Sequence, residues 1–265
     1  KCKFCLCRKR RGNQKGASMK KTDRMCGVLA GAMAAGVGMG LIGFAAGCKS
    51  MGDETCCACT AQVERRHMNN AVFYKEGKLD SARAKQAYFA MMTKFNVPVY
   101  EALKKDDGFF WVVDFGKGDF TSFGMGGVFW ANEPDGYLGH EIYLLPWQSI
   151  PEHKHLPTKD KDGKVIPCKM ESWQVRYGYV YGFSEVGEPN LDQFPEAKAM
   201  LAKVQIPHLK SLHVQKWEAD GKVYKLAGPE TWHFMMAGPE GAIVSEYATY
   251  HDGAGLRFSV PGVSL

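Results

Sequence analysis

The stretch HEIYLLPWQSIPEHKH, at residues 140–155, decides the fold. Its first half is rich in aromatic and β-branched residues, which is typical of a β-strand. The run Pro151-Glu152-His153-Lys154-His155 then follows at the end of this strand-like segment. Side chains two positions apart on a strand point to the same face, so His153 and His155 can both point inward at one ion. The stretch therefore predicts a buried strand followed by a pair of candidate metal-ligating histidines.

The chain around this stretch predicts helices first and strands afterwards. A helix is expected from Asp80 or Ser81, because Tyr88, Met92 and Phe95 share one face. Asn96 and Pro98 end it, and a second short helix is expected through EALKK, so that residues 80–105 form a helical part. Beyond Gly108, short aromatic and β-branched runs separated by Gly, Pro or Asp predict an all-β barrel or sandwich. These runs are FFWVVDF, GGVFWAN, HEIYLLPW, WQVRYGYVYGF, KVYKL, WHFMMAG and AIVSEYATY, with a long insertion over 184–210 that contains one helical patch, PEAKAMLAKV.

The net charge of +6 belongs to one end of the chain of 265 residues. Residues 1–24 hold ten Lys/Arg against one acid, and the remainder holds 24 Lys/Arg against 27 Asp/Glu, which is a net charge of −3. The working part of the protein is thus mildly acidic, and nucleic acid is not expected as a partner. A composition with 45% hydrophobic and 23% charged residues also excludes a disordered chain and a multi-span membrane protein.

The N-terminal part resembles an export signal. A basic stretch beginning at Met19 precedes the uncharged apolar segment 26–47, and the segment ends in Phe-Ala-Ala-Gly before Cys48, as in a bacterial lipobox. The resemblance implies that residues 1–47 are a leader and that Cys48 is lipidated, with Met19 as a possible true start. A transmembrane anchor is the alternative. We expect an exported protein of the cell envelope, lipid-anchored or periplasmic, that contacts membrane only through this segment; the protein would be cytoplasmic if the signal is not used.

Eight of the nine cysteines precede the body of the chain, so no disulfide framework is expected in the fold. Residues 48–70 form a cysteine-rich tether with Cys56, Cys57 and Cys59, and residues 71–265 form the predicted functional domain.

Two later features complete a candidate metal site. Glu171 opens the strand that follows the histidine pair, and His233 lies in a strand further along. Three imidazoles and one carboxylate form a mixed nitrogen and oxygen set that suits manganese, iron, nickel or zinc and leaves positions for water or substrate. The alternative is that each histidine is an ordinary surface or core residue.

These residues resemble the first motif of the cupin superfamily, which is H-x-H, then Glu, then six residues, then Gly. Glu171 followed by six residues reaches Gly178, and His233 takes the place of the histidine of the second motif. Two features depart from the pattern: the segment LPTKDKDGKVIPC lengthens the gap before Glu171, and residues 227–233 replace the usual proline and glycine spacing. The resemblance implies an all-β cupin, a double-stranded β-helix or jelly-roll barrel, with N-terminal helices.

A closer similarity is to the D-lyxose isomerase family of cupins. It is carried by Gly118-Asp119-Phe120, HEIYLLPWQSIPEHKH, Lys169-Met170-Glu171 and VSEYATYHDGAGLRF, and it covers about residues 70–265. It implies a metal-dependent aldose–ketose isomerase for a free pentose or hexose, D-lyxose and D-xylulose for example. It also implies Mn²⁺, with Zn²⁺, Fe²⁺, Ni²⁺ or Co²⁺ as alternatives, and it places the four ligands at His153, His155, Glu171 and His233.

Such an isomerisation moves a proton between adjacent carbons, so a carboxylate must shuttle it. Alternation along IVSEYATY points Glu246 inward and makes it the candidate base, while Lys169 shares the face of Glu171 and can stabilise negative charge on a sugar oxygen. We expect three further substrate contacts, each with a purely structural role as the alternative: His140, Asp252 and Arg257. For His251 we expect only a surface or structural role.

Two other function classes stay open at this point. A different metallocupin enzyme, an oxygenase or a decarboxylase, would use the same ligand set, and a lipid-anchored cupin could capture sugar without catalysis. Exposed sheet edges predict a homodimer.

Overall fold

The computed structural model describes residues 68–265, apart from 106, 107 and 135. The predicted leader, the signal segment with Cys48, the tether cysteines Cys56, Cys57 and Cys59, and Met19 all lie outside the described residues. Within the described part of the chain, no helix has the length and apolar character needed to span a bilayer.

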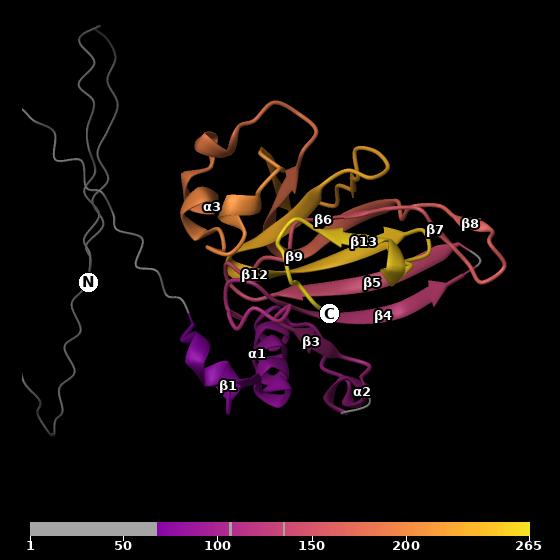
Figure 1. The fold of residues 1–265 in the computed structure, drawn as a ribbon. Helices are drawn as coiled ribbons and strands as arrows, with labels where there is room; N and C mark the ends of the chain where they lie inside the picture. Colours follow the sequence, from indigo (N-terminus) through magenta and orange to yellow (C-terminus); the bar gives the residue numbers. More distant parts are fainter. Residues whose placement is uncertain (1–67, 106–107, 135) are drawn as a thin grey trace, which may run out of the picture. The chain divides into compact units, whose positions relative to one another are not determined.

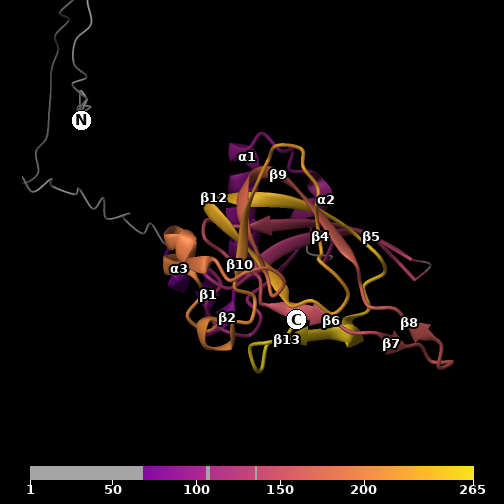
Figure 2. The same ribbon diagram turned by 90° about the horizontal axis from the view of Figure 1, so that it is seen from above.

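The predicted all-β body with helices at its start is confirmed (Figure 1). The main antiparallel sheet has the order β10-β9-β12-β5-β4-β3, with β11 paired to β9, and β6 paired to both β12 and β13. Figure 2 shows the sheet curling so that β6 and β13 face the strands β4 and β5 across the interior. The strands are β1 (Tyr74–Lys75), β2 (Lys78–Leu79), β3 (Trp111–Val113), β4 (Met125–Glu133), β5 (Tyr137–Leu144), β6 (His153–His155), β7 (Thr158–Lys159), β8 (Val165–Ile166), β9 (Glu171–Ser184), β10 (His213–Glu218), β11 (Tyr224–Lys225), β12 (His233–Ala248) and β13 (Leu256–Phe258).

Two long strands, β9 and β12, pair along both halves of the sheet and bend together. The register slips between Ala237 and Ala242, and a second irregularity follows Ile243. Gly178 sits at this bend with φ +70°, and an added Cβ would collide with the carbonyl oxygen of Gly241. The glycine of the H-x-H motif is therefore required for the bend. Because the strand continues through Gly238 and Pro239, the prediction of two separate strands over 232–250 was wrong.

Helix α1 (Ser81–Lys94) covers the outer face of β4, β5 and β12. The Asp80 side chain accepts a hydrogen bond from the Arg83 amide and caps the helix as predicted. Tyr88 and Met92 are buried against Tyr143 and Ile243 on the outer face of the sheet. The helix leaves the inner face of these strands free to line a cavity.

The remaining elements are short. The short helix α2 (Glu101–Lys104) forms where it was expected, and the charged insertion before Glu171 is the hairpin β7–β8. In the insertion over 184–210, helix α3 (Pro195–Met200) is shorter than the predicted patch because Leu201 leaves the helical region. The single-turn helices are η1 (Asn70–Phe73), η2 (Leu191–Gln193), η3 (Ile206–His208) and η4 (Gly253–Gly255).

Candidate active site

The four candidate ligands meet inside the barrel, from three strands. His153 and His155 lie on β6, Glu171 begins β9, and His233 begins β12 directly opposite His153. One ligand atom from each of the four residues lies within 4.8 Å of the others. The long hairpin before Glu171 does not displace this residue, because β7 and β8 pair with each other outside the sheet.

Backbone carbonyls orient two of the imidazoles. Nδ1 of His153 is 2.8 Å from the Pro151 carbonyl oxygen, and Nδ1 of His233 is 2.9 Å from that of Thr231. A carbonyl only accepts hydrogen bonds, so each Nδ1 carries the proton. The Nε2 lone pair is then free in both rings, as metal ligation requires.

Several ligand atoms in the cluster are buried without hydrogen bonds. Among the described residues, these include both ring nitrogens of His155, Nε2 of His233 and Oε2 of Glu171. His233 Nε2 and Glu171 Oε2 are only 2.8 Å apart but are not aligned as donor and acceptor. Buried polar atoms normally find partners. Unsatisfied nitrogen and oxygen ligands converging on one point fit a divalent metal ion.

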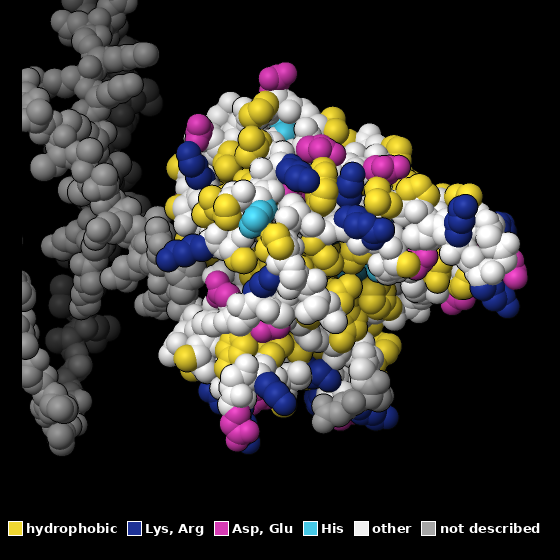
Figure 3. All heavy atoms as spheres, in the orientation of Figure 1, with side chains coloured by type: hydrophobic (Ala, Val, Ile, Leu, Met, Phe, Trp, Pro, Cys, Tyr) yellow, Lys and Arg dark blue, Asp and Glu magenta, His cyan; other side chains and the backbone are white. Residues whose placement is uncertain are grey.

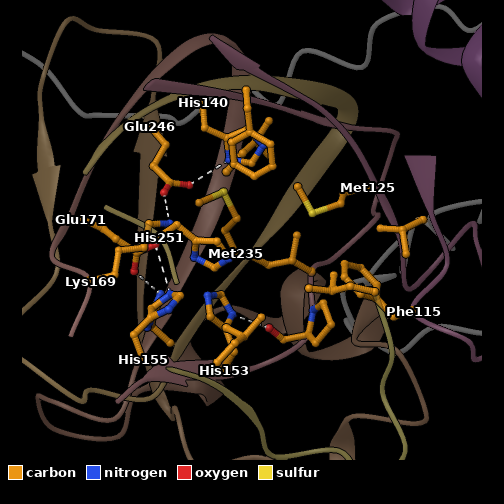
Figure 4. Close-up of a pocket in the computed structure, with 18 of the residues that line it drawn as sticks. Phe115, Met125, His140, His153, His155, Lys169, Glu171, Met235, Glu246 and His251 are labelled. Carbon is orange, nitrogen blue, oxygen red and sulfur yellow. Dashed lines mark hydrogen bonds and ion pairs between the residues drawn. The ribbon is translucent and has the colours of Figure 1, made fainter. Parts of the chain in front are cut away.

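Lys169 connects this cluster to the candidate base. Its Nζ donates to Glu171 Oε1 at 2.8 Å and to Glu246 Oε1. Glu246 Oε2 lies 3.3 Å from His140 Nδ1, directly across the β5–β12 pairing. His140, Glu246, Lys169 and Glu171 thus form one buried polar chain, drawn in Figure 4.

The charges in this chain are set by mutual pairing. Burial alone would raise the pKa of Glu171 and of Glu246, but the Lys169 ammonium and the neighbouring histidines together outweigh it, so both pKa values lie below the usual range. Burial would lower the pKa of Lys169, and the two carboxylates reverse this effect and raise it. Burial, reinforced by the neighbouring imidazoles, holds the pKa of His153 well below its ordinary value. For His233, the attraction of Glu171 outweighs burial and raises the pKa.

These residues line a cavity of about 430 Å³, within the size range of small-molecule sites. Trp111, Phe129 and Trp173 also line it, whereas Trp147 and Phe234 belong to the core and Trp130 is exposed outside. Among the described residues, eleven buried side-chain atoms lack hydrogen bonds, and seven of them belong to residues of this cavity. The cavity therefore concentrates polar groups that a ligand can satisfy.

The structure does not bring Asp252 and Arg257 into this group. Asp252 accepts hydrogen bonds from the Thr158 hydroxyl and the Ala254 amide, and its carboxylate caps η4. The Arg257 guanidinium is exposed and donates to the carbonyls of Ala254 and Leu256. Neither residue lines the cavity, and they do not pair with each other in the described structure. Their role as substrate contacts therefore has no support from this placement.

One cavity residue, His251, has no predicted role. Its backbone N–H and carbonyl are both held by the Asn132 side chain, and its ring lies edge-on to His155 at 5.4 Å between centroids. Burial, followed by the Lys169 charge, lowers the pKa of His251 to about 4, so the ring is neutral, and Nδ1 has no partner among the described residues. His251 lies beyond the end of β12, where alternation no longer indicates the direction of a side chain.

Comparison with known proteins places the chain among sugar isomerases. No family model matches. The chain is 32% identical to the D-lyxose/D-mannose isomerase of Thermosediminibacter oceani over 62% of its own length and 88% of the relative. It is 35% identical to the D-lyxose ketol-isomerase of Cohnella laeviribosi, over 52% and 69% of the two chains. The L-ribose isomerase of Acinetobacter sp. DL28 shares its fold, with a TM-score of 0.52 at 16% identity over 68% and 91% of the chains. The predicted all-β barrel is confirmed, and the chain belongs to the D-lyxose isomerase family of sugar isomerases.

Proposed function

We propose that this isomerase interconverts a free aldose and its ketose, of the D-lyxose and D-xylulose type, with a divalent metal bound by His153, His155, Glu171 and His233. One observation carries the proposal: a buried carboxylate, Glu246, is joined through a single lysine to a four-ligand cluster in the same cavity. The mixed ligand set suits Mn²⁺, with Zn²⁺, Fe²⁺, Ni²⁺ and Co²⁺ as alternatives.

The metal would supply polarisation of the oxygens on C1 and C2 of the sugar, which acidifies the C–H bond of C2. Glu246 then accepts the proton from C2 and returns it to C1, while the hydroxyl proton of O2 passes to O1. The lowered pKa of Glu246 keeps this residue as a carboxylate that can accept the proton. His140 fixes the orientation of Glu246 through the second carboxylate oxygen.

Lys169 would stabilise the negative charge that develops on the sugar oxygens. It is the cation that already balances Glu246 and Glu171, and its side chain is only 7% exposed. A charge–charge interaction in such a buried site is stronger than in water. The oxygenase, decarboxylase and binding-only hypotheses do not use Glu246 to carry a proton. Membership of an isomerase family also favours the isomerase.

The test is turnover of D-lyxose by the Mn²⁺-loaded protein and by its Glu246→Gln variant. We expect kcat to fall about 10²- to 10⁴-fold in the variant, as for removal of a general base, with metal content unchanged. Glu141→Gln is the matched control, because Glu141 is also a buried glutamate but contacts Ser245 and lies outside the cavity lining. Full activity in Glu246→Gln, or metal binding without interconversion of any pentose or hexose, would contradict the proposal.

A further inference from the structure

The cavity that holds the candidate site is polar at one end and apolar at the other. Figure 4 shows His140, Glu246, Glu171, Lys169 and His251 on one side and Met125 and Phe115 on the opposite side. Met235 lies between these two groups in the same view (Figure 4). We call Met235 and the apolar lining side chains beyond it the apolar end; its six side chains contain no nitrogen or oxygen atoms. They are Val113, Phe115, Met125, Ile142, Ile150 and Met235.

Strand register produces this separation. On β5 the cavity-facing residue after His140 is Ile142, and on β12 the one after His233 is Met235. Met125 on β4 pairs with Val113 on β3 at the same end. Two strands, β5 and β12, thus change from an imidazole to an apolar side chain within two residues, which is about 7 Å along a strand.

The unsatisfied polar atoms are confined to the other end. The seven such atoms in the cavity belong to His140, His155, Glu171, His233, His251 and Trp111, and Trp111 stacks on His140 with 5.6 Å between centroids. Among the described residues, the apolar end therefore offers no side-chain partner for a sugar hydroxyl. Figure 3 shows hydrophobic side chains gathered between β13 and β4 on this face of the molecule.

We infer that the preferred substrate is an aldose whose far end is deoxygenated, a 6-deoxyhexose. This inference rests on the proposed function, which places C1 and C2 beside Glu246. Four carbon–carbon bonds of about 1.5 Å connect C2 to C6 and span about 5 Å in an extended chain, so a sugar that lies along β5 from Glu246 directs C6 toward Ile142. A hydroxyl there would lose water without gaining a partner, whereas a methyl group is favoured by burial against Met125 and Met235.

The test compares three sugars that share configuration at C2, C3 and C4: D-lyxose, D-mannose and 6-deoxy-D-mannose. With the Mn²⁺-loaded protein, we expect kcat/KM for the 6-deoxy sugar to exceed that for D-mannose about 10- to 100-fold, the usual range for one group in an apolar pocket. Val113→Thr adds a hydroxyl without changing the size of the side chain and should reduce this ratio at least threefold. Val186→Thr, at an exposed valine outside the cavity, should leave the ratio unchanged.

Equal or better turnover of D-mannose would overturn the inference while leaving the proposed function intact. If no sugar is interconverted, the proposed function fails, and calorimetric binding of the same sugars to the metal-loaded Glu246→Gln protein decides the inference separately. At least tenfold tighter binding of the 6-deoxy sugar would then still support it, and equal binding or no binding would refute it.

Discussion

Replacing Lys169 with Met tests the central electrostatic feature of the site. The substitution keeps an unbranched side chain of nearly the same length but removes the ammonium group that pairs with Glu171 at 2.8 Å and with Glu246. The three side chains are 2–7% exposed, so neither carboxylate can recover its hydration. Breaking a buried pair by removing one partner costs about 3–5 kcal/mol.

We expect this loss in the metal-free protein, measured by urea unfolding in EDTA. For a domain of this size, about 2–4 °C of melting temperature corresponds to each kcal/mol, so the melting temperature should fall by about 6–20 °C. Added Mn²⁺ should reduce the difference between variant and parent, because a bound cation would compensate the charge of Glu171. Introducing Glu246→Gln into the variant should also recover part of the loss, since one of the two unpaired charges disappears.

Lys104→Met is the control for charge removal as such. Lys104 pairs with Glu101 at 2.7 Å, but the two side chains are 48% and 84% exposed. An exposed pair of this kind contributes at most about 1 kcal/mol. If Lys169→Met costs no more than Lys104→Met in EDTA, or if Mn²⁺ does not reduce the loss, the buried-charge account of the site is wrong.

Three further predictions concern metal, pH and export. Substituting His233→Ala should weaken Mn²⁺ binding by at least about 100-fold, beyond the usual effect of a residue that only supports a ligand, and isothermal calorimetry measures it. Burial, opposed by Ser245 and Arg176, raises the pKa of Glu141. A raised pKa means that the ionised form disfavours folding, so Glu141→Gln should increase the melting temperature at pH 7, and the gain should vanish below about pH 4.3, the ordinary pKa of glutamate. Cys48→Ser should abolish incorporation of labelled fatty acid in a bacterial host, and labelling that persists would refute the lipidation hypothesis.

The sequence predicts the histidine pair and the inward direction of Glu246 well, because both predictions rest on the alternation of side chains within one strand. His153 and His155 share a strand face, and alternation likewise directs Glu246 inward from β12. Gly178 was expected only from its place in the family motif, and the structure supplies the reason, because a Cβ at this positive φ would collide with the carbonyl oxygen of Gly241. Each of these predictions depends on a few neighbouring residues, and the structure agrees with their predicted positions.

The positions of side chains outside regular strands could not be predicted from local sequence patterns. Asp252 and Arg257 follow β12 in sequence, but the turn at η4 engages them in local hydrogen bonds. His251 is positioned by the amide of Asn132, 119 residues away in sequence, and no local pattern encodes that contact. The apolar end is equally non-local, because its side chains come from different strands and meet only through sheet register. Long-range pairing therefore determines the parts of the cavity that sequence patterns missed.

The net charge that Lys169, Glu171 and Glu246 give the buried polar chain also affects whether the site favours the neutral sugar or the transition state. With neutral histidines, Lys169, Glu171 and Glu246 together carry one net negative charge. A divalent cation in the four-ligand cluster would change this to one net positive charge, which matches a single negative charge developing on the sugar oxygens. Because interactions that strengthen only as that charge develops accelerate the reaction, this balance favours the transition state over the neutral sugar. Lys169 contributes to this balance: without its charge the metal-loaded group of side chains would be neutral overall, and its attraction for the developing negative charge would be weaker.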